Sequence, residues 1–243
     1  MRLFLVLFFL FAHSAHAFTL ITQDPEQEGW ASDKVTFRIN RANCPANIND
    51  LLQAAVKVWN GVPWSRLKVE IGEDSSTTIA ALASGVAPDA PLIVCDTNFS
   101  VTTGSDENSV AGIGFVSGGT RPLIYGGVVL NVQAGGSANL NNLSSDLASV
   151  IIAHEIGHVL GIGHSEDKAA LMYFDGSYKK TLSLAQDDVQ AILYLYPRDE
   201  WSGKQIGGCG TIGFSGNWIW LLLAPILLGF GLLVKSRKLA FEN

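Results

Sequence analysis

The most informative stretch of the sequence carries three histidines in the pattern H-E-x-x-H-x-x-G-x-x-H. His154 and His158 are four residues apart, so on a helix both imidazoles lie on one face and can reach the same metal ion. Glu155 lies beside them, where its carboxylate can act as a base on a metal-bound water. Gly161 can adopt a backbone conformation that other residues avoid, which lets the helix end and brings His164 round as a third ligand. Three nitrogen ligands on Zn²⁺ leave a fourth position open for water, as in catalytic zinc sites.

The alternative interpretation is a buried helix that contains histidines by chance. The chain has five histidines, and His13 and His16 lie in an N-terminal segment that we expect to be removed, so every histidine of the mature protein belongs to the motif. Met172 is the only methionine besides the initiator, and it follows eight residues after His164. The glycine, the third histidine and the downstream methionine together favour the metal site.

This motif, followed by a methionine, resembles the signature of the metzincin zinc proteases. The segments H-S-E-D at 164–167, A-L-M-Y at 170–173 and L-S-L-A-Q-D-D-V at 182–189 resemble the matrixin branch, the family of the matrix metalloproteinases. The close resemblance covers residues 145–196, and a looser one reaches back to the first strand. It implies an α+β fold of the metzincin, zincin-like type. Such a fold has a mixed twisted sheet of about five strands, an active-site helix, a backing helix and a C-terminal helix.

The resemblance also implies roles for single residues. Glu155 would deprotonate the attacking water and then protonate the leaving amine of a cleaved peptide. Met172 would form a hydrophobic floor under the three histidines. Tyr173 and Phe174 would belong to the wall of the pocket for the residue after the cleaved bond, with Phe174 at a position where matrixins typically have Pro. We expect a single zinc ion, because the mature chain, without His13 and His16, has no histidine upstream of the active helix to bind the second, structural zinc of the matrix metalloproteinases.

Residues 111–116 and 124–132 are expected to form a pair of strands. By its position before the active helix, the first resembles the edge strand on which a matrixin binds its substrate, where an extended peptide adds through main-chain hydrogen bonds. An ordinary edge hairpin is the alternative. The candidate substrate-binding residues of this strand are Gly112, Ile113, Gly114 and Phe115.

Other parts of the chain show strand and helix patterns. Strands are expected over 35–39, 67–71, 77–82 and 91–95. A helix running to about residue 60 carries an apolar stripe that includes Trp59, which we interpret as a core residue. Ser144 or Ser145 is expected to cap the active helix. A final helix is expected to have Ser183 as its cap and Gln186 as its capping-box partner, and to end before Pro197.

The loop at 96–109 and the cysteines leave alternatives open. Asp96, Asp106 and Glu107 could bind Ca²⁺, as loops of this family often do, but their irregular spacing favours a solvated loop. Outside the cytoplasm, a disulfide between Cys44 and Cys95 is expected, with two buried free thiols as the alternative; Cys209 would then be left over.

The two ends of the chain carry targeting signals. Residues 1–17 have the basic residue, apolar run and A-x-A site of a secretory signal peptide. A protease domain is expected at 18–198 and a glycine-containing linker at 199–216. A transmembrane helix is expected at 217–234, with a basic cytoplasmic tail at 235–243. Small residues around Cys209 are followed by the apolar helix and then by the basic tail. This order also resembles a C-terminal sorting signal that a membrane protease processes.

The net charge of the expected domain limits the classes of partner that it can bind. Residues 18–200 contain 11 Lys and Arg against 21 Asp and Glu, a net charge of −10, which argues against nucleic acid as a partner.

The leading hypothesis is a membrane-anchored zinc endopeptidase that acts on proteins or peptides. It would face the cell surface or periplasm, unless processing releases it. The alternative is a zinc-stabilised surface binding or adhesion module without turnover.

Overall fold

The computed structural model describes residues 18–24, 26–83, 90–117 and 122–198. The signal peptide expected at 1–17, the linker, the transmembrane helix, the basic tail and Cys209 lie outside these ranges and stay predictions. Among the residues that the structure describes, no helix is both long and apolar enough to cross a bilayer.

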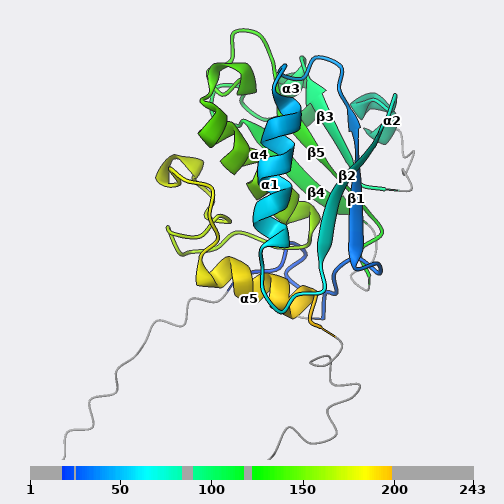
Figure 1. Ribbon diagram of the computed structural model, residues 1–243. Coiled ribbons are helices and arrows are strands. Elements are labelled where there is room, and N and C mark those ends of the chain that lie inside the picture. The colour runs from blue at the N-terminus through cyan, green and yellow to red at the C-terminus, as the bar shows by residue number, and fades with distance from the viewer. Residues whose placement is uncertain (1–17, 25, 84–89, 118–121, 199–243) are drawn as a thin grey trace, which may run out of the picture. The chain divides into compact units, whose positions relative to one another are not determined.

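Five strands form one mixed sheet in the order β2-β1-β3-β5-β4 (Figure 1). Their bounds are β1 (Lys34–Asn40), β2 (Lys68–Asp74), β3 (Leu92–Asp96), β4 (Gly112–Ser117) and β5 (Tyr125–Asn131). β1 pairs in parallel with β2 and β3, and β3 pairs in parallel with β5. β4 runs antiparallel to β5 and forms one edge of the sheet.

Two long helices, α1 (Ile48–Asn60) and α4 (Ser145–Val159), pack against one face of the sheet, and α5 (Gln186–Leu195) crosses below them (Figure 1). Short helices α2 (Ile79–Ala83) and α3 (Phe99–Thr103) lie in the connections, as do the 3₁₀ turns Leu140–Asn142 and Gly176–Tyr178. The predicted α+β class is confirmed, with a mixed five-stranded sheet, an active-site helix, a backing helix and a C-terminal helix.

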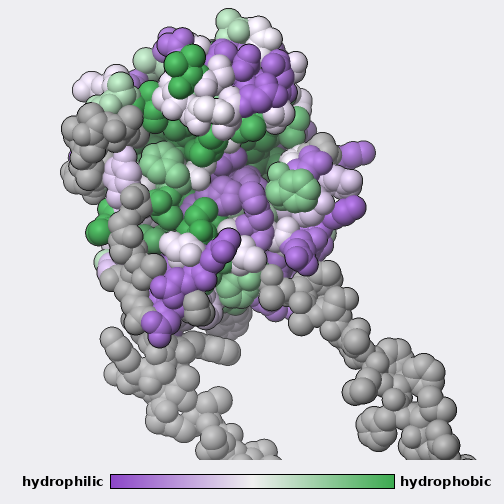
Figure 2. All heavy atoms as spheres, turned by 180° about the vertical axis from the view of Figure 1, so that it is seen from behind, coloured by the Kyte–Doolittle hydropathy of each residue, from purple (hydrophilic) through white to green (hydrophobic). Residues whose placement is uncertain are grey.

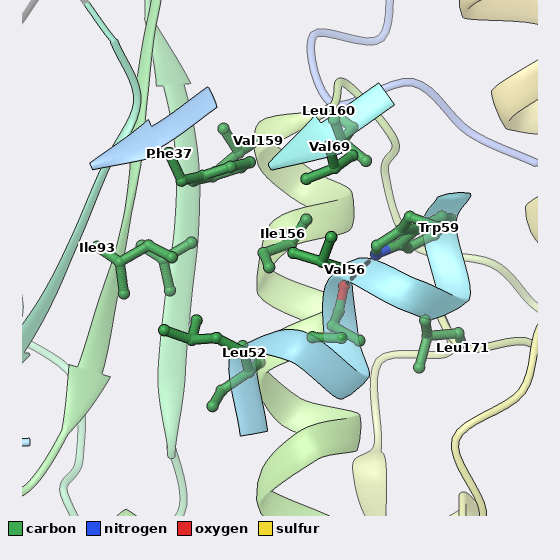
Figure 3. Packing of buried hydrophobic residues seen from close by; sticks show 14 of the residues in the cluster. Phe37, Leu52, Val56, Trp59, Val69, Ile93, Ile156, Val159, Leu160 and Leu171 are labelled. Carbon is green, nitrogen blue, oxygen red and sulfur yellow. Dashed lines mark hydrogen bonds between the residues drawn. The ribbon is translucent and has the colours of Figure 1, made fainter. Parts of the chain in front are cut away.

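The main core lies between the sheet and the pair α1 and α4 (Figure 3). Trp59 of α1 is fully buried, and its indole Nε1 donates a 2.8 Å hydrogen bond to the main-chain oxygen of Ala153 in α4. This bond satisfies the one polar atom of the side chain, so the whole ring can be buried without an unpaired donor. The interpretation of Trp59 as a core residue is confirmed. Trp59 therefore fixes α4 at the residue that precedes His154.

Two sequence predictions about local structure are wrong. The strand expected over 77–82 is the short helix α2, because Ala80 and Ala81 favour helix and the main-chain oxygen of Thr78 accepts a 3.1 Å bond from Ala81. The N-cap of α5 is Ala185 instead of Ser183. The carboxylate of Asp188 accepts a 2.7 Å bond from the Ala185 amide, so the capping-box pair is Ala185 with Asp188 and not Ser183 with Gln186.

Candidate metal centre and active-site cleft

Helix α4 carries the first two histidines of the motif into the interior. Its N-cap is Ser144, whose hydroxyl accepts a 3.3 Å hydrogen bond from the amide of Leu147. The helix is buried on most sides, which explains why its apolar residues do not form a single stripe. Gly157 lies where a side chain cannot fit: a Cβ there would come within 2.4 Å of the Met172 sulfur. The motif therefore needs a small residue at this position for packing as well as ligands for chemistry.

The rings of His154 and His158 are each held by a main-chain carbonyl. Nδ1 of His154 donates to the oxygen of Leu171 at 2.8 Å, and Nδ1 of His158 donates to the oxygen of Ile162, also at 2.8 Å. A carbonyl can only accept, so each Nδ1 carries the hydrogen and each Nε2 keeps its lone pair for a metal ion. These bonds fix the tautomer as well as the orientation of both rings.

His164 completes the group from the loop after α4. Gly161 has φ +105°, which is the left-handed turn expected at this glycine. Ring centroids are 4.7 Å apart for His154 and His158, 5.4 Å for His154 and His164, and 4.8 Å for His158 and His164. The candidate ligand atoms of the three residues all lie within 4.8 Å of one another, so the group could hold one metal ion.

Loss of water around these imidazoles favours their neutral form. His154 and His158 are 9% and 7% exposed, whereas His164 is exposed at the cleft. Loss of hydration lowers the pKa of all three, and it lowers that of His158 to about 3. Neutral imidazole is the form that binds metal, so the site is set up for binding at neutral pH.

Glu155 is a buried carboxylate next to the histidines. It is 8% exposed, and its Oε2 accepts a 2.5 Å hydrogen bond from the amide of Gly114 in β4. Burial raises the pKa of Glu155 to about 7, although the Gly114 hydrogen bond acts in the opposite direction. A carboxyl group with a pKa near neutrality is suited to take up and return a proton.

Two glycines allow β4 to approach the active helix. A Cβ on Gly112 would lie 2.9 Å from Cγ of Glu155, and one on Gly114 would lie 2.2 Å from the Glu155 main-chain oxygen. Both contacts are shorter than real Cβ atoms show, so any larger residue would push strand and helix apart. The edge strand therefore lies directly beside Glu155.

The histidines and Glu155 open into a cleft of about 1230 Å³. The face opposite that of Figure 1 has hydrophilic atoms at a central hollow with hydrophobic atoms around it (Figure 2). Of the candidate substrate-binding residues, those that line the cleft are Gly112, Ile113, Gly114, Tyr173 and Phe174. Phe115 does not: its ring packs 5.8 Å from that of Tyr125, in a cluster on the other face of the sheet. Alternation along the strand turns Gly112 and Gly114 toward α4 and places the side chains of Ile113 and Phe115 on the opposite face, where Ile113 also packs in that cluster while still bordering the cleft.

The turn that contains Met172 lies under the histidines. Met172 is 1% exposed, and the carboxylate of Asp188 accepts bonds from the amides of Leu171 at 2.8 Å and Met172 at 3.0 Å. Asp188 therefore holds the turn whose Leu171 carbonyl orients His154. Sequence reasoning missed this role, although an acid in the first turn of a predicted helix is a recognisable anchor for nearby amides.

The remaining predicted sites lie apart from the histidines. Cys44 and Cys95 form a disulfide that joins the segment after β1 to β3, with their Cα atoms 5.2 Å apart. Among the described residues, only the three histidines form a group of metal-ligating side chains, so Asp96, Asp106 and Glu107 are not gathered into a calcium site. Asp106 instead accepts hydrogen bonds from Asn108 and Ser109.

Comparison with known proteins places this geometry in context. Residues 92–197 match the family model described as Matrixin, a stretch that is less than half of the 243-residue chain. Matrix metalloproteinase-20 of Homo sapiens is 25% identical over 194 residues, which cover 74% of this chain and 35% of that protein. Matrix metalloproteinase-18 of Xenopus laevis is 51% identical over 49 residues, 19% of this chain and 10% of that protein. Metalloendoproteinase 1 of Glycine max is 50% identical over 52 residues, 21% of this chain and 17% of that protein.

The chain thus spans about a third or less of the length of these relatives. It is similar to metalloproteases of the matrixin type, and its α+β fold with a mixed sheet is consistent with their catalytic domain. The matched stretch contains all three histidines, Glu155 and Met172.

Proposed function

We propose that this protein is a zinc-dependent endopeptidase. The observation that carries the proposal is the convergence of three neutral imidazoles beside a buried carboxylate, in an open cleft next to the edge of a sheet. The similarity to matrixins supports the same reaction class.

The donor set fits one zinc ion. His154, His158 and His164 offer three nitrogen ligands, and the carbonyls of Leu171 and Ile162 hold two of the rings with Nε2 free. When bound, zinc would polarise the scissile carbonyl and make a coordinated water more acidic. An open cleft leaves room for water and substrate at the fourth position.

Glu155 is proposed as the general base and then the general acid. Its carboxylate takes a proton from the attacking water and delivers it to the amine that leaves, so no covalent bond between enzyme and substrate is needed. The Gly114 amide holds the carboxylate at Oε2, which leaves the other oxygen for proton transfer. Met172 packs beneath and keeps the ligand-bearing helix in position.

The cleft is proposed to bind an extended peptide along β4. β4 has one partner, β5, and forms the edge of the sheet, so a peptide can add through main-chain hydrogen bonds with little dependence on sequence. Side chains would be selected by the apolar wall of the cleft, and Tyr173 and Phe174 form one side of it. Phe174 is 65% exposed, so it is available for substrate contact.

We further propose that the domain works outside the cytoplasm. The expected signal peptide at 1–17 and the disulfide between Cys44 and Cys95 both favour an oxidising compartment. The apolar segment at 217–234 and the basic tail would anchor it to a membrane, with processing near Cys209 by a sorting protease as the alternative fate. Tagging the C-terminus and detecting the tag on the mature protein would contradict processing.

The test replaces Glu155 by Gln in the full-length chain. Zinc content should stay at one ion per chain while cleavage of a mixed peptide library falls by about 10²-fold or more. Glu73→Gln is the matched control, because Glu73 is an exposed acid of β2 that does not line the cleft, and it should retain activity. Unchanged cleavage in Glu155→Gln would refute the assigned base. A wild-type chain that binds zinc and cleaves nothing would favour the binding or adhesion module.

A further inference from the structure

The short link between the second and third ligands, residues 161–164, determines where His164 lies. His154 and His158 are anchored within α4, but His164 belongs to a loop and is exposed. The Ile162 carbonyl of the link already accepts the hydrogen bond from Nδ1 of His158. After His164 the chain is held by the Ser165 amide, which donates a 2.8 Å hydrogen bond to the Met172 oxygen. Before His164, its position depends on what holds the rest of the link.

Most of that support comes from the start of the described chain. We name residues 19–24, 26 and 27 the N-terminal strap. Leu20 of the strap pairs in an antiparallel bridge with Ile162 of the link. Main-chain hydrogen bonds run from the Ile21 amide to the Gly161 oxygen at 3.0 Å and from the Gly163 amide to the Thr19 oxygen at 2.8 Å. The strap is thus a short strand partner for the link.

Two side chains of the strap add bonds of their own. The Thr19 hydroxyl donates a 2.6 Å hydrogen bond to the main-chain oxygen of His164 itself. Gln27 is 2% exposed, and its Nε2 donates to the Gly161 oxygen at 2.7 Å. Its Oε1 accepts from the amide of Thr22 at 3.0 Å and from the Thr22 hydroxyl at 2.7 Å, so the orientation of the buried amide is fixed.

The strap and the link also fit without spare room. A Cβ on Gly161 would lie 2.5 Å from Nε2 of Gln27, and one on Gly163 would lie 2.4 Å from the Thr19 hydroxyl oxygen. Neither segment can shift far toward the other. Both ends of the link are therefore held, Gly161 by Gln27 and His164 by Thr19.

We propose that Thr19 and Gln27 are positioning residues for the third metal ligand. Through the main chain of the link, they hold His164 where its ring completes the group with His154 and His158. The inference rests on the proposed function, since it concerns the same site. Outer residues that orient a ligand typically change metal affinity by about 10- to 100-fold when they are removed. A looser strap should therefore release the metal ion faster without unfolding the domain.

The test measures zinc release from the full-length chain into an excess of a chromogenic chelator at neutral pH. Thr19→Val keeps the shape of the side chain and removes the donor, and it should release zinc about tenfold faster. Thr19→Ser restores the hydroxyl and should return the rate close to that of the wild type. Thr102→Val makes the same change at an exposed threonine of α3 outside the cleft, and it should leave the rate unchanged.

Gln27→Met is a second variant, which removes the buried donor at similar volume and should also release zinc faster. Circular dichroism checks that each variant is folded. The proposal is overturned if Thr19→Val and a folded Gln27→Met release zinc at the wild-type rate, or if Thr19→Ser is as fast as Thr19→Val. A wild-type chain that binds zinc but does not cleave peptides would overturn the proposed function and leave this assay intact. A wild-type chain that binds no zinc would overturn both.

Discussion

Replacing Glu155 by glutamine should make the metal-free protein more stable at alkaline pH. In the unfolded chain this carboxyl group has its ordinary pKa of 4.5, and burial raises it to about 7 in the folded protein. The folded state therefore holds its proton more tightly than the unfolded state. Ionisation of the buried group therefore lowers the free energy of unfolding. This loss grows as the pH rises from the unfolded pKa to the folded pKa, and it reaches its full size above about pH 7.

The size of this effect follows from the same pKa values. With these two pKa values, ionisation of the buried group lowers the free energy of unfolding by about 3 kcal/mol at pH 8 and by about 1 kcal/mol at pH 5, where the folded group is still protonated. Glutamine has nearly the same shape, cannot ionise, and can still accept the hydrogen bond from Gly114. Glu155→Gln should therefore gain about 3 kcal/mol over the wild type at pH 8 and much less at pH 5.

The assay is urea unfolding in the presence of a chelator at several pH values, with the variant and the wild type compared at each. Titration of the histidines also changes the free energy of unfolding with pH, but it does so in both proteins. The difference in unfolding free energy between variant and wild type therefore reports on residue 155. Glu166→Gln serves as the control, because the side chain of Glu166 is exposed, and its stability difference should be near zero throughout. The reasoning is refuted if Glu155→Gln is no more stable than the wild type at pH 8, or if the difference does not vary with pH.

Two further predictions concern groups that stabilise the fold without binding substrate. Asp188→Ala should cost about 3 kcal/mol or more of unfolding free energy, because it leaves the buried amides of Leu171 and Met172 without an acceptor; equal stability in urea would contradict this. Replacing both cysteines of the pair Cys44 and Cys95 by serine should lower stability by about 4 kcal/mol, as expected for a bridge that closes a loop of this length, and a melting temperature unaffected by the replacement would contradict it.

The candidate metal centre could be predicted from sequence because its geometry is local. A spacing of four residues places His154 and His158 on one helix face whatever the rest of the fold does, and Gly161 marks the turn that brings back His164. The strands β1, β3 and β5 were predictable for a similar reason, since their β-branched runs are typical of buried strands.

What could not be predicted depends on contacts between distant segments. Gln27 and Gly161 are 134 positions apart, and nothing in the composition of the N-terminal segment indicates that it pairs beside His164. Phe115 was assigned to the substrate strand together with its neighbours, but strand alternation turns its ring to the other face. The strand expected at 77–82 failed because a few alanines favour a helical turn in a short connection.

The central claim is that three imidazoles hold a single zinc ion with a fourth position open. X-ray absorption at the zinc edge of the purified full-length chain tests it most directly, together with metal analysis. We expect one zinc per chain, with three imidazole nitrogens at about 2.0–2.1 Å and an oxygen as the fourth ligand. A chain without stoichiometric zinc, or a sulfur ligand at about 2.3 Å, would contradict the assignment of the site.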